Sequence, residues 1–275
     1  MSGRMMRLFW FPCSTLFSSC ADPGVNEKLD GTSVSFRVIL PNLITVLTLV
    51  IGLTSIMLSL HGYWKIAVWG VLVSGVLDAC DGHIARLLNG TSKFGAELDN
   101  ISDFVNFGVV PSILLYMWLL KEHWQAGWIV SLIFSVSCAL RLARFSASQG
   151  FVKPKWQTSF LTGVPAPAGA ITGLVPFYIN EIAPFSMDET SAIISSVYIV
   201  FIASLMVSRI PTFAPNNVIK YLREQKVISF LIGLAFTILV MRYQFHVLLA
   251  LAVCYLICVP FSWRSFLRLA ARENQ

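Results

Sequence analysis

Charged residues are scarce in this chain. Aspartate, glutamate, lysine and arginine together make up 12% of its 275 residues, roughly half the share that is typical of soluble domains. Apolar residues account for 56%. This composition argues against an ordinary soluble domain and predicts an integral membrane protein, because the chain is long enough for many spanning helices of about 20 residues each.

Clustered positive charge and cysteine metal motifs are lacking too. The net charge of +6 is scattered over many loops, so nucleic-acid binding is not expected, whereas attraction to anionic membrane lipid is. Cys254 and Cys258 are four residues apart, but no further ligands accompany them. These cysteines are therefore expected to act as small apolar residues.

Hydrophobic runs predict an all-α fold, a polytopic membrane helix bundle with about eight transmembrane helices. The predicted spans are residues 38–60, 64–88, 97–120, 126–147, 163–182, 191–209, 227–243 and 245–262. Three parts are expected along the chain. They are a mobile or interfacial N-terminal extension over 1–36, a membrane domain over 37–263, and a short basic cytoplasmic tail over 264–275.

The basic residues predict how this bundle is oriented. All but three of the 20 lysines and arginines fall on one side of the predicted spans, the exceptions being Lys65, Lys121 and Arg242. The positive-inside rule makes that side cytoplasmic. Both chain termini are therefore expected in the cytoplasm, and the protein is expected to be a multi-pass membrane protein.

Four aspartates interrupt the second and third predicted spans. Carboxylates at membrane depth are costly unless something neutralises them, so they mark a functional site by default. On one helix Asp78 and Asp81 lie within about 100° of each other, and on the next Asp99 and Asp103 stack four residues apart. The four carboxylates would repel one another in an empty pocket. Divalent cations, which prefer oxygen ligands, would neutralise this charge.

The aspartates belong to a pattern of residues at fixed spacing, Asp78-x2-Asp81-Gly82-x2-Ala85-Arg86-x8-Gly95-x3-Asp99-x3-Asp103. This pattern resembles the signature of the CDP-alcohol phosphotransferases, and every fixed position is present. Flanking segments extend the resemblance over roughly residues 38–262, and they are most similar to the family members that use serine. These segments include Pro41-Asn42-Leu-Ile-Thr45, Arg141-Leu-Ala-Arg144-Phe145 and Gly163-Val-Pro-Ala-Pro-Ala-Gly-Ala170.

The resemblance implies an enzyme that transfers the phosphatidyl group of CDP-diacylglycerol to L-serine, giving phosphatidylserine and CMP. It also implies a homodimer in a bacterial-type inner (plasma) membrane, with the active site facing the cytoplasm. Two Mg²⁺ or Mn²⁺ ions would be held by Asp78, Asp81, Asp99 and Asp103, with Asp103 also taking the proton of the attacking hydroxyl. The residues expected to bind CDP-diacylglycerol are Asn42, Thr45, Gly82, Ala85, Arg86 and Gly95.

Several of these residues have a plainer interpretation. Small residues such as Gly82, Ala85 and Gly95 also let membrane helices pack closely. Asn42 and Thr45 can cap a helix after a proline.

Recognition of the acceptor alcohol is predicted from basic and polar residues near the aspartates. Arg144, and after it Arg141, could clamp the serine carboxylate, since a guanidinium group binds a carboxylate through two parallel hydrogen bonds. Phosphate binding or anchoring at the membrane interface would suit these arginines equally well. Asn106, three residues beyond Asp103, could assist.

Other functions compete with this interpretation. The same chemistry could serve glycerol 3-phosphate, choline or inositol as the acceptor. A membrane prenyltransferase also binds diphosphate through magnesium and aspartates, but it usually carries two separated acidic motifs, and this chain has one compact block. A transporter would favour broken helices near the midplane and repeated halves, and the sequence displays neither.

Overall fold

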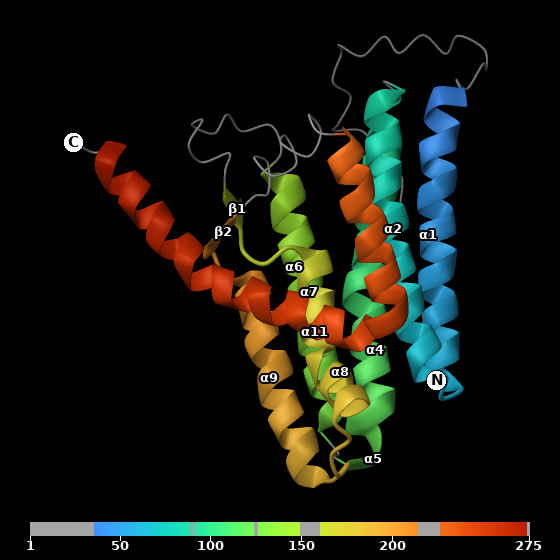
Figure 1. Cartoon of the computed structure of the whole chain (residues 1–275), viewed down its shortest axis with the longest axis vertical. Helices are drawn as coiled ribbons and strands as arrows, with labels where there is room; N and C mark the ends of the chain where they lie inside the picture. The colour runs from blue at the N-terminus through green and yellow to red at the C-terminus, as the bar shows by residue number, and fades with distance from the viewer. Residues whose placement is uncertain are drawn as a thin grey trace, which may run out of the picture. The chain divides into compact units, whose positions relative to one another are not determined.

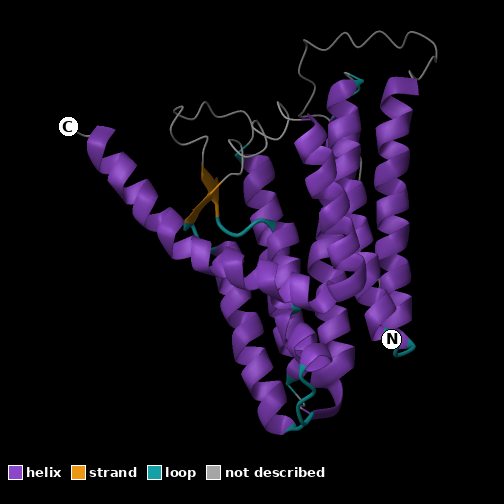
Figure 2. Ribbon diagram, viewed as in Figure 1, coloured by secondary structure: helices purple, strands orange, loops and turns teal. Residues whose placement is uncertain are grey.

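The computed structural model describes residues 36–88, 90, 92–123, 126–148, 160–213 and 226–273, which all belong to one compact unit, Ser35–Gln275. Helices dominate this unit (Figures 1 and 2). The helices are α1 (Phe36–Leu60), α2 (Trp64–Leu87), α3 (Lys93–Asp103), the π-helix η1 (Phe104–Val109), α4 (Val110–Leu115), the π-helix η2 (Tyr116–Leu120), α5 (Lys121–His123), α6 (Gly127–Ala147), α7 (Ala166–Gly173), α8 (Val175–Ile182), α9 (Glu189–Val207) and α11 (Lys226–Glu273).

Six helices in the described part of the chain are long and apolar enough to cross a membrane. This confirms the polytopic membrane helix bundle that the composition predicts. The candidate spans are Ile39–Leu60, Trp64–Leu87, Lys93–Leu120, Gly127–Ala147, Glu189–Val207 and Leu239–Phe266.

The structure differs from the eight predicted spans in the second half of the chain. The segment 163–182 contains two helices of eight residues, α7 and α8, separated at Leu174. Pro176 stands at the start of α8, where its ring and missing N–H prevent a continuous helix. Residues 227–262 lie in the single element α11, whose backbone leaves helical geometry at Tyr243 (φ −132°, ψ 44°). That residue lies at the predicted boundary between the last two spans.

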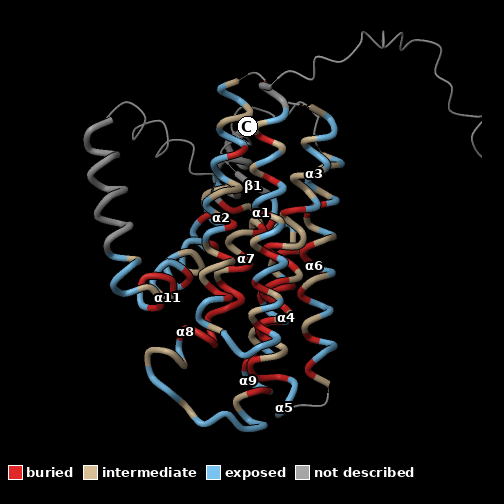
Figure 3. Tube along the Cα trace, turned by 90° about the vertical axis from the view of Figure 1, so that its right-hand side faces the viewer, coloured by how far each residue is buried: buried red, intermediate tan, exposed pale blue. Residues whose placement is uncertain are grey.

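The third span, from α3 to η2, forms the centre of the bundle. In Lys93–Leu120, 61% of the most apolar stretch is buried, against 28% in Ile39–Leu60. Figure 3 shows buried segments concentrated along α4 and its neighbours. The side chains that fill this core include Phe107, Leu114, Phe134, Phe177 and Tyr178.

The first two helices form an antiparallel pair, joined at Gly62, whose positive φ of 80° suits glycine. They pack side by side along their length (Figure 1). Because their directions are opposed, the start of α1 lies beside the end of α2. This arrangement brings Asn42 and Thr45 next to the aspartates of α2.

A short antiparallel pair of strands, β1 (Phe160–Thr162) and β2 (Pro211–Phe213), joins two segments that are distant in sequence. Gly163 follows β1 with a φ of 76°, and an added Cβ there would lie 2.9 Å from the carbonyl oxygens of Met206 and Ser208. The Thr212 hydroxyl donates to the Gly163 carbonyl at 2.9 Å. The chain before α7 is therefore fixed against the end of α9.

Polar contacts also fix the other ends of α2, α8 and α9. Lys65 at the start of α2 forms a 2.7 Å ion pair with Glu181 near the end of α8. Asp188 caps α9, and the hydrogen bond that it accepts from the Ser191 backbone N–H lowers the pKa of its carboxyl group. The ion pair links the start of α2 to the end of α8, and the cap marks where α9 begins.

Candidate functional site

Three carboxylates meet where the end of α2 lies beside α3. One carboxylate oxygen each from Asp78, Asp81 and Asp99 lies within 4.8 Å of the other two. Asp81 is buried, with 3% of its surface exposed, and the other two are half-buried. Negative charges at this range repel one another strongly outside bulk water. The donor set of carboxylate oxygens therefore fits a hard divalent cation.

Asp103 lies beside this group without being part of it. It is the last residue of α3, and its carboxyl group lies against that of Asp78. Its Oδ1 atom is buried and finds no hydrogen-bond partner among the described residues. An unsatisfied buried oxygen of this kind costs about 1–3 kcal/mol. A bound cation or a polar group of a substrate would satisfy it.

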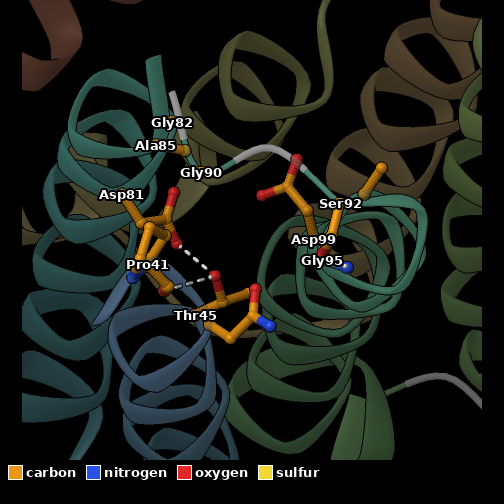
Figure 4. A pocket seen from close by; sticks show the side chains of 11 residues that line it. Pro41, Thr45, Asp81, Gly82, Ala85, Gly90, Ser92, Gly95 and Asp99 are labelled. Atoms are coloured by element: carbon orange, nitrogen blue, oxygen red, sulfur yellow. Dashed lines mark hydrogen bonds between the residues drawn. The ribbon is translucent and has the colours of Figure 1, made fainter. Parts of the chain in front are cut away.

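A pocket with a volume of about 190 Å³ lies between α1, α2 and α3 (Figure 4). Asp81 and Asp99 come from opposite sides of this pocket. Its lining residues are Pro41, Asn42, Thr45, Asp81, Gly82, Ala85, Gly90, Ser92, Gly95, Ala96 and Asp99. All but one of the residues predicted to bind CDP-diacylglycerol thus line one cavity. The exception, Arg86, is exposed, and its Nε donates to the Gly82 carbonyl at 2.9 Å.

Thr45 and Asn42 connect α1 to the aspartate-bearing helices. The Thr45 hydroxyl lies 2.7 Å from Asp81 Oδ2 and 3.1 Å from the Pro41 carbonyl, and it can donate to either. The first bond orients the Asp81 carboxylate toward the pocket, which helix capping alone would not do. Asn42 lies directly against Gly95, where an added Cβ would come within 2.6 Å of its Oδ1.

The two glycines of the pocket have different surroundings. At Gly95 the absent side chain lets α3 approach Asn42, so close helix packing accounts for this residue. At Gly82 an added Cβ would meet no described heavy atom within 4 Å. Helix packing therefore does not account for Gly82, whose open side adjoins the cavity that it lines.

The residues predicted to recognise the acceptor lie in three different places. Arg141 on α6 interacts electrostatically with Asp103, and its buried Nε makes no hydrogen bond within the described ranges. Arg144 Nη1 donates to the Val207 carbonyl at 2.6 Å, which satisfies a free carbonyl at the end of α9. Asn106 is fully buried. Its Nδ2 donates to Ser102 Oγ at 3.1 Å, and its Oδ1 lies against Gly52 of α1.

The structure adds pocket residues that sequence reasoning did not select. Ser92 caps α3 by accepting a 2.9 Å hydrogen bond from the Gly95 N–H, and it also lines the cavity. A serine just before a helix predicts an N-cap, so the sequence alone could have identified this role of Ser92. Gly90 and Ala96 line the cavity as well. Both are small residues at positions that the predicted motif leaves open.

Comparisons with known proteins agree with this geometry. The chain belongs to the CDP-alcohol phosphatidyltransferase family, whose model matches residues 38–208, more than half of its length. The match includes the four aspartates and every residue that lines the pocket.

Curated relatives carry the name CDP-diacylglycerol–serine O-phosphatidyltransferase. The Mycobacterium tuberculosis protein is 42% identical over 135 residues, which cover 49% of this chain and 47% of that protein. The Mycobacterium leprae protein is 37% identical over 176 residues (63% and 57%), and the Helicobacter pylori protein is 36% identical over 170 residues (62% and 70%). The chain thus spans about half the length of the mycobacterial relatives that it matches.

Proposed function

We propose that this protein transfers the phosphatidyl group of CDP-diacylglycerol to L-serine, forming phosphatidylserine and CMP. The observation that carries the proposal is the meeting of Asp78, Asp81 and Asp99 beside a cavity lined by small residues. The family supports transfer from a CDP-linked donor. The names of the relatives support serine as the acceptor.

In this proposal the cytidine diphosphate of the donor occupies the cavity between α1, α2 and α3. Gly82 and Ala85 let a flat group approach the α2 backbone, and Asn42 offers its amide as a hydrogen-bond partner. Exposed Arg86 stands one turn from Gly82 and pairs with a phosphate oxygen. The acyl chains of the donor remain in the bilayer.

Asp78, Asp81, Asp99 and Asp103 are the residues that would hold two Mg²⁺ or Mn²⁺ ions. When bound, such ions neutralise the diphosphate and stabilise the charge that develops on it during transfer. The close approach of three of these carboxylates and the contact of Asp103 with Asp78 support this role. Thr45 keeps Asp81 oriented toward the pocket.

The chemical step is a displacement at the phosphorus that carries the diacylglycerol. Asp103 removes the proton from the serine hydroxyl, whose oxygen then bonds to that phosphorus. The bond between the phosphorus and the bridging oxygen breaks, and CMP leaves with the bridging oxygen and its electron pair. The free Oδ1 of Asp103 suits it to this proton transfer, since a general base must lie within hydrogen-bond reach of the proton that it removes.

Arg141 is the better placed of the two arginines to bind the serine carboxylate. It faces Asp103, whereas Arg144 already donates to the Val207 carbonyl. In this proposal Arg144 supports the site by holding the end of α9. Asn106, whose amide oxygen lacks a partner in the described structure, is assigned to the serine ammonium group.

The setting of the enzyme is also part of the proposal. The distribution of lysine and arginine supports termini and an active site that face the cytoplasm. A bacterial-type inner (plasma) membrane is proposed from the bacterial relatives. A homodimer is proposed on the family alone.

Transfer to a panel of alcohols tests the assignment. Purified protein in detergent with CDP-diacylglycerol and Mg²⁺ should incorporate radiolabelled serine into lipid and release an equal amount of CMP. Glycerol 3-phosphate, choline and inositol should give incorporation at least about 100-fold lower, because buried polar groups left unpaired reject a poorly matched substrate. Incorporation of one of these in place of serine would refute the acceptor and leave the donor chemistry standing.

Gly82→Leu should block donor binding without disturbing the fold. The new side chain meets no described atom near its Cβ and projects beside the cavity, and leucine also favours the helix over glycine. We expect the KM for CDP-diacylglycerol to rise at least about tenfold, which corresponds to a loss of roughly 1.4 kcal/mol of binding. The thermal unfolding temperature should not fall. Val76→Leu, at an exposed position on the same helix, is the matched control.

A further inference from the structure

Three buried polar atoms without hydrogen-bond partners lie on three different helices around Arg141. They are Asp103 Oδ1 on α3, Arg141 Nε on α6 and the Tyr255 hydroxyl on α11, each unpartnered among the residues described. Arg141 interacts electrostatically with both of the other side chains. Buried polar groups are nearly always paired in folded proteins. Three such atoms around one guanidinium group therefore indicate a missing polar ligand.

Tyr255 reaches this place because α11 packs against β2. Its hydroxyl oxygen lies beside the Thr212 side chain but has no hydrogen bond of good geometry in the described structure. The Thr212 hydroxyl itself donates to the Gly163 carbonyl. Because the Tyr255 hydroxyl makes no hydrogen bond among the described residues, its proton is available to a ligand. Tyr255 also lies outside residues 38–208, the part of the chain that the family model matches.

We propose that Tyr255 is an acceptor-recognition residue that binds, together with Arg141, the carboxylate of a small hydroxy amino acid. The identity of that amino acid, serine, rests on the proposed function. Arg141 Nε–H and the Tyr255 hydroxyl are donors, and a carboxylate accepts two hydrogen bonds from such a pair. Asp103 Oδ1 is an acceptor, and the hydroxyl of the same ligand donates to it.

This arrangement explains why one ligand satisfies all three atoms. An acceptor held by its carboxylate between α6 and α11 presents its hydroxyl to the carboxyl group of α3. An alcohol that lacks a negatively charged group leaves Arg141 and Tyr255 unpaired, which selects against it. In this proposal the polar groups from α6 and α11 therefore determine which alcohol reacts, while α1, α2 and α3 hold the donor.

The test is Tyr255→Phe, which removes only the hydroxyl. We expect the KM for serine to rise about tenfold, because a hydrogen bond to a charged group is lost. The kcat and the KM for CDP-diacylglycerol should stay within about twofold of the wild type. Serinol lacks the carboxylate of serine. The preference for serine over serinol should therefore fall by the same factor by which the KM for serine rises. A purely structural role for Tyr255 would not alter that preference.

Tyr178→Phe is the matched control. Its hydroxyl is also buried without a partner in the described part, but it lies in the core on α8, beside Phe245. This variant should retain wild-type values for all three constants. If Tyr255→Phe keeps both the serine KM and the preference over serinol, the proposal is overturned while serine transfer stands. If the wild type uses a different alcohol, the serine assignment fails, and an unchanged KM of Tyr255→Phe for that alcohol would overturn this inference as well.

Discussion

Asp103→Asn should lower the kcat for transfer to serine by about 10³-fold, within the range for loss of a general base. The amide cannot accept the hydroxyl proton, yet it keeps the size of the side chain and one oxygen. Asp103 is proposed for this role because its Oδ1 has no partner in the described structure and its carboxyl group lies against that of Asp78. Radiolabelled serine incorporated under single-turnover conditions measures the chemical step.

The control for this experiment is Glu97→Gln on the same helix. Glu97 is exposed, so losing its charge should leave the rate within about twofold, as surface substitutions usually do. Activity of Asp103→Asn within tenfold of the wild type would remove Asp103 from the proton transfer. The proposed metal binding by the other three aspartates would not be affected, because it does not require a base at position 103.

Removal of divalent cations should abolish transfer and also lower the thermal stability of the protein. Asp78, Asp81 and Asp99 repel one another when nothing lies between their oxygens, which approach within 4.8 Å. A cation at about 100 times its dissociation constant stabilises the folded state by about 2.7 kcal/mol. Unfolding in detergent, followed with EDTA and then with added Mg²⁺ or Mn²⁺, measures this effect without any substrate.

Asp99→Asn separates the effect of the cation from that of the fold. With EDTA present this variant should unfold at a higher temperature than the wild type, because one of three repelling charges is gone. Added Mg²⁺ should raise its unfolding temperature less than that of the wild type. Glu97→Gln should respond to Mg²⁺ as the wild type does. Full activity of the wild type in EDTA, with no change in unfolding temperature, would refute the metal site.

Helix periodicity was sufficient to predict that Asp78, Asp81 and Asp99 converge. Asp78 and Asp81 share one face of α2, and the short link to α3 leaves little choice in how Asp99 meets them. The same spacing predicted the positions of Gly82 and Gly95. Spacing could not show that the two glycines have different surroundings. A side chain at Gly95 would clash with Asn42, whereas Gly82 faces open space, and both surroundings depend on how neighbouring elements pack.

The acceptor side could not be predicted in the same way. Arg141 and Arg144 are three residues apart, so the sequence places both on one helix face without saying what each meets. In the structure Arg144 donates a hydrogen bond to the carbonyl of Val207, 63 residues later in the chain, whereas Arg141 interacts electrostatically with Asp103. Tyr255 has no spacing relation to the motif at all. Its place follows from the packing of α11 on β2, which is tertiary information.

The proposed site combines neighbouring and distant segments of the chain, and this has a consequence for biogenesis. Every residue that lines the 190 Å³ cavity comes from α1, α2, α3 or the link before α3. Domains form progressively as a chain is synthesised, and contacts between close segments form fastest. The cavity proposed for the donor can therefore assemble as soon as the third helix has entered the bilayer. The proposed acceptor-recognition residues Arg141 and Tyr255 come together only when α11 arrives.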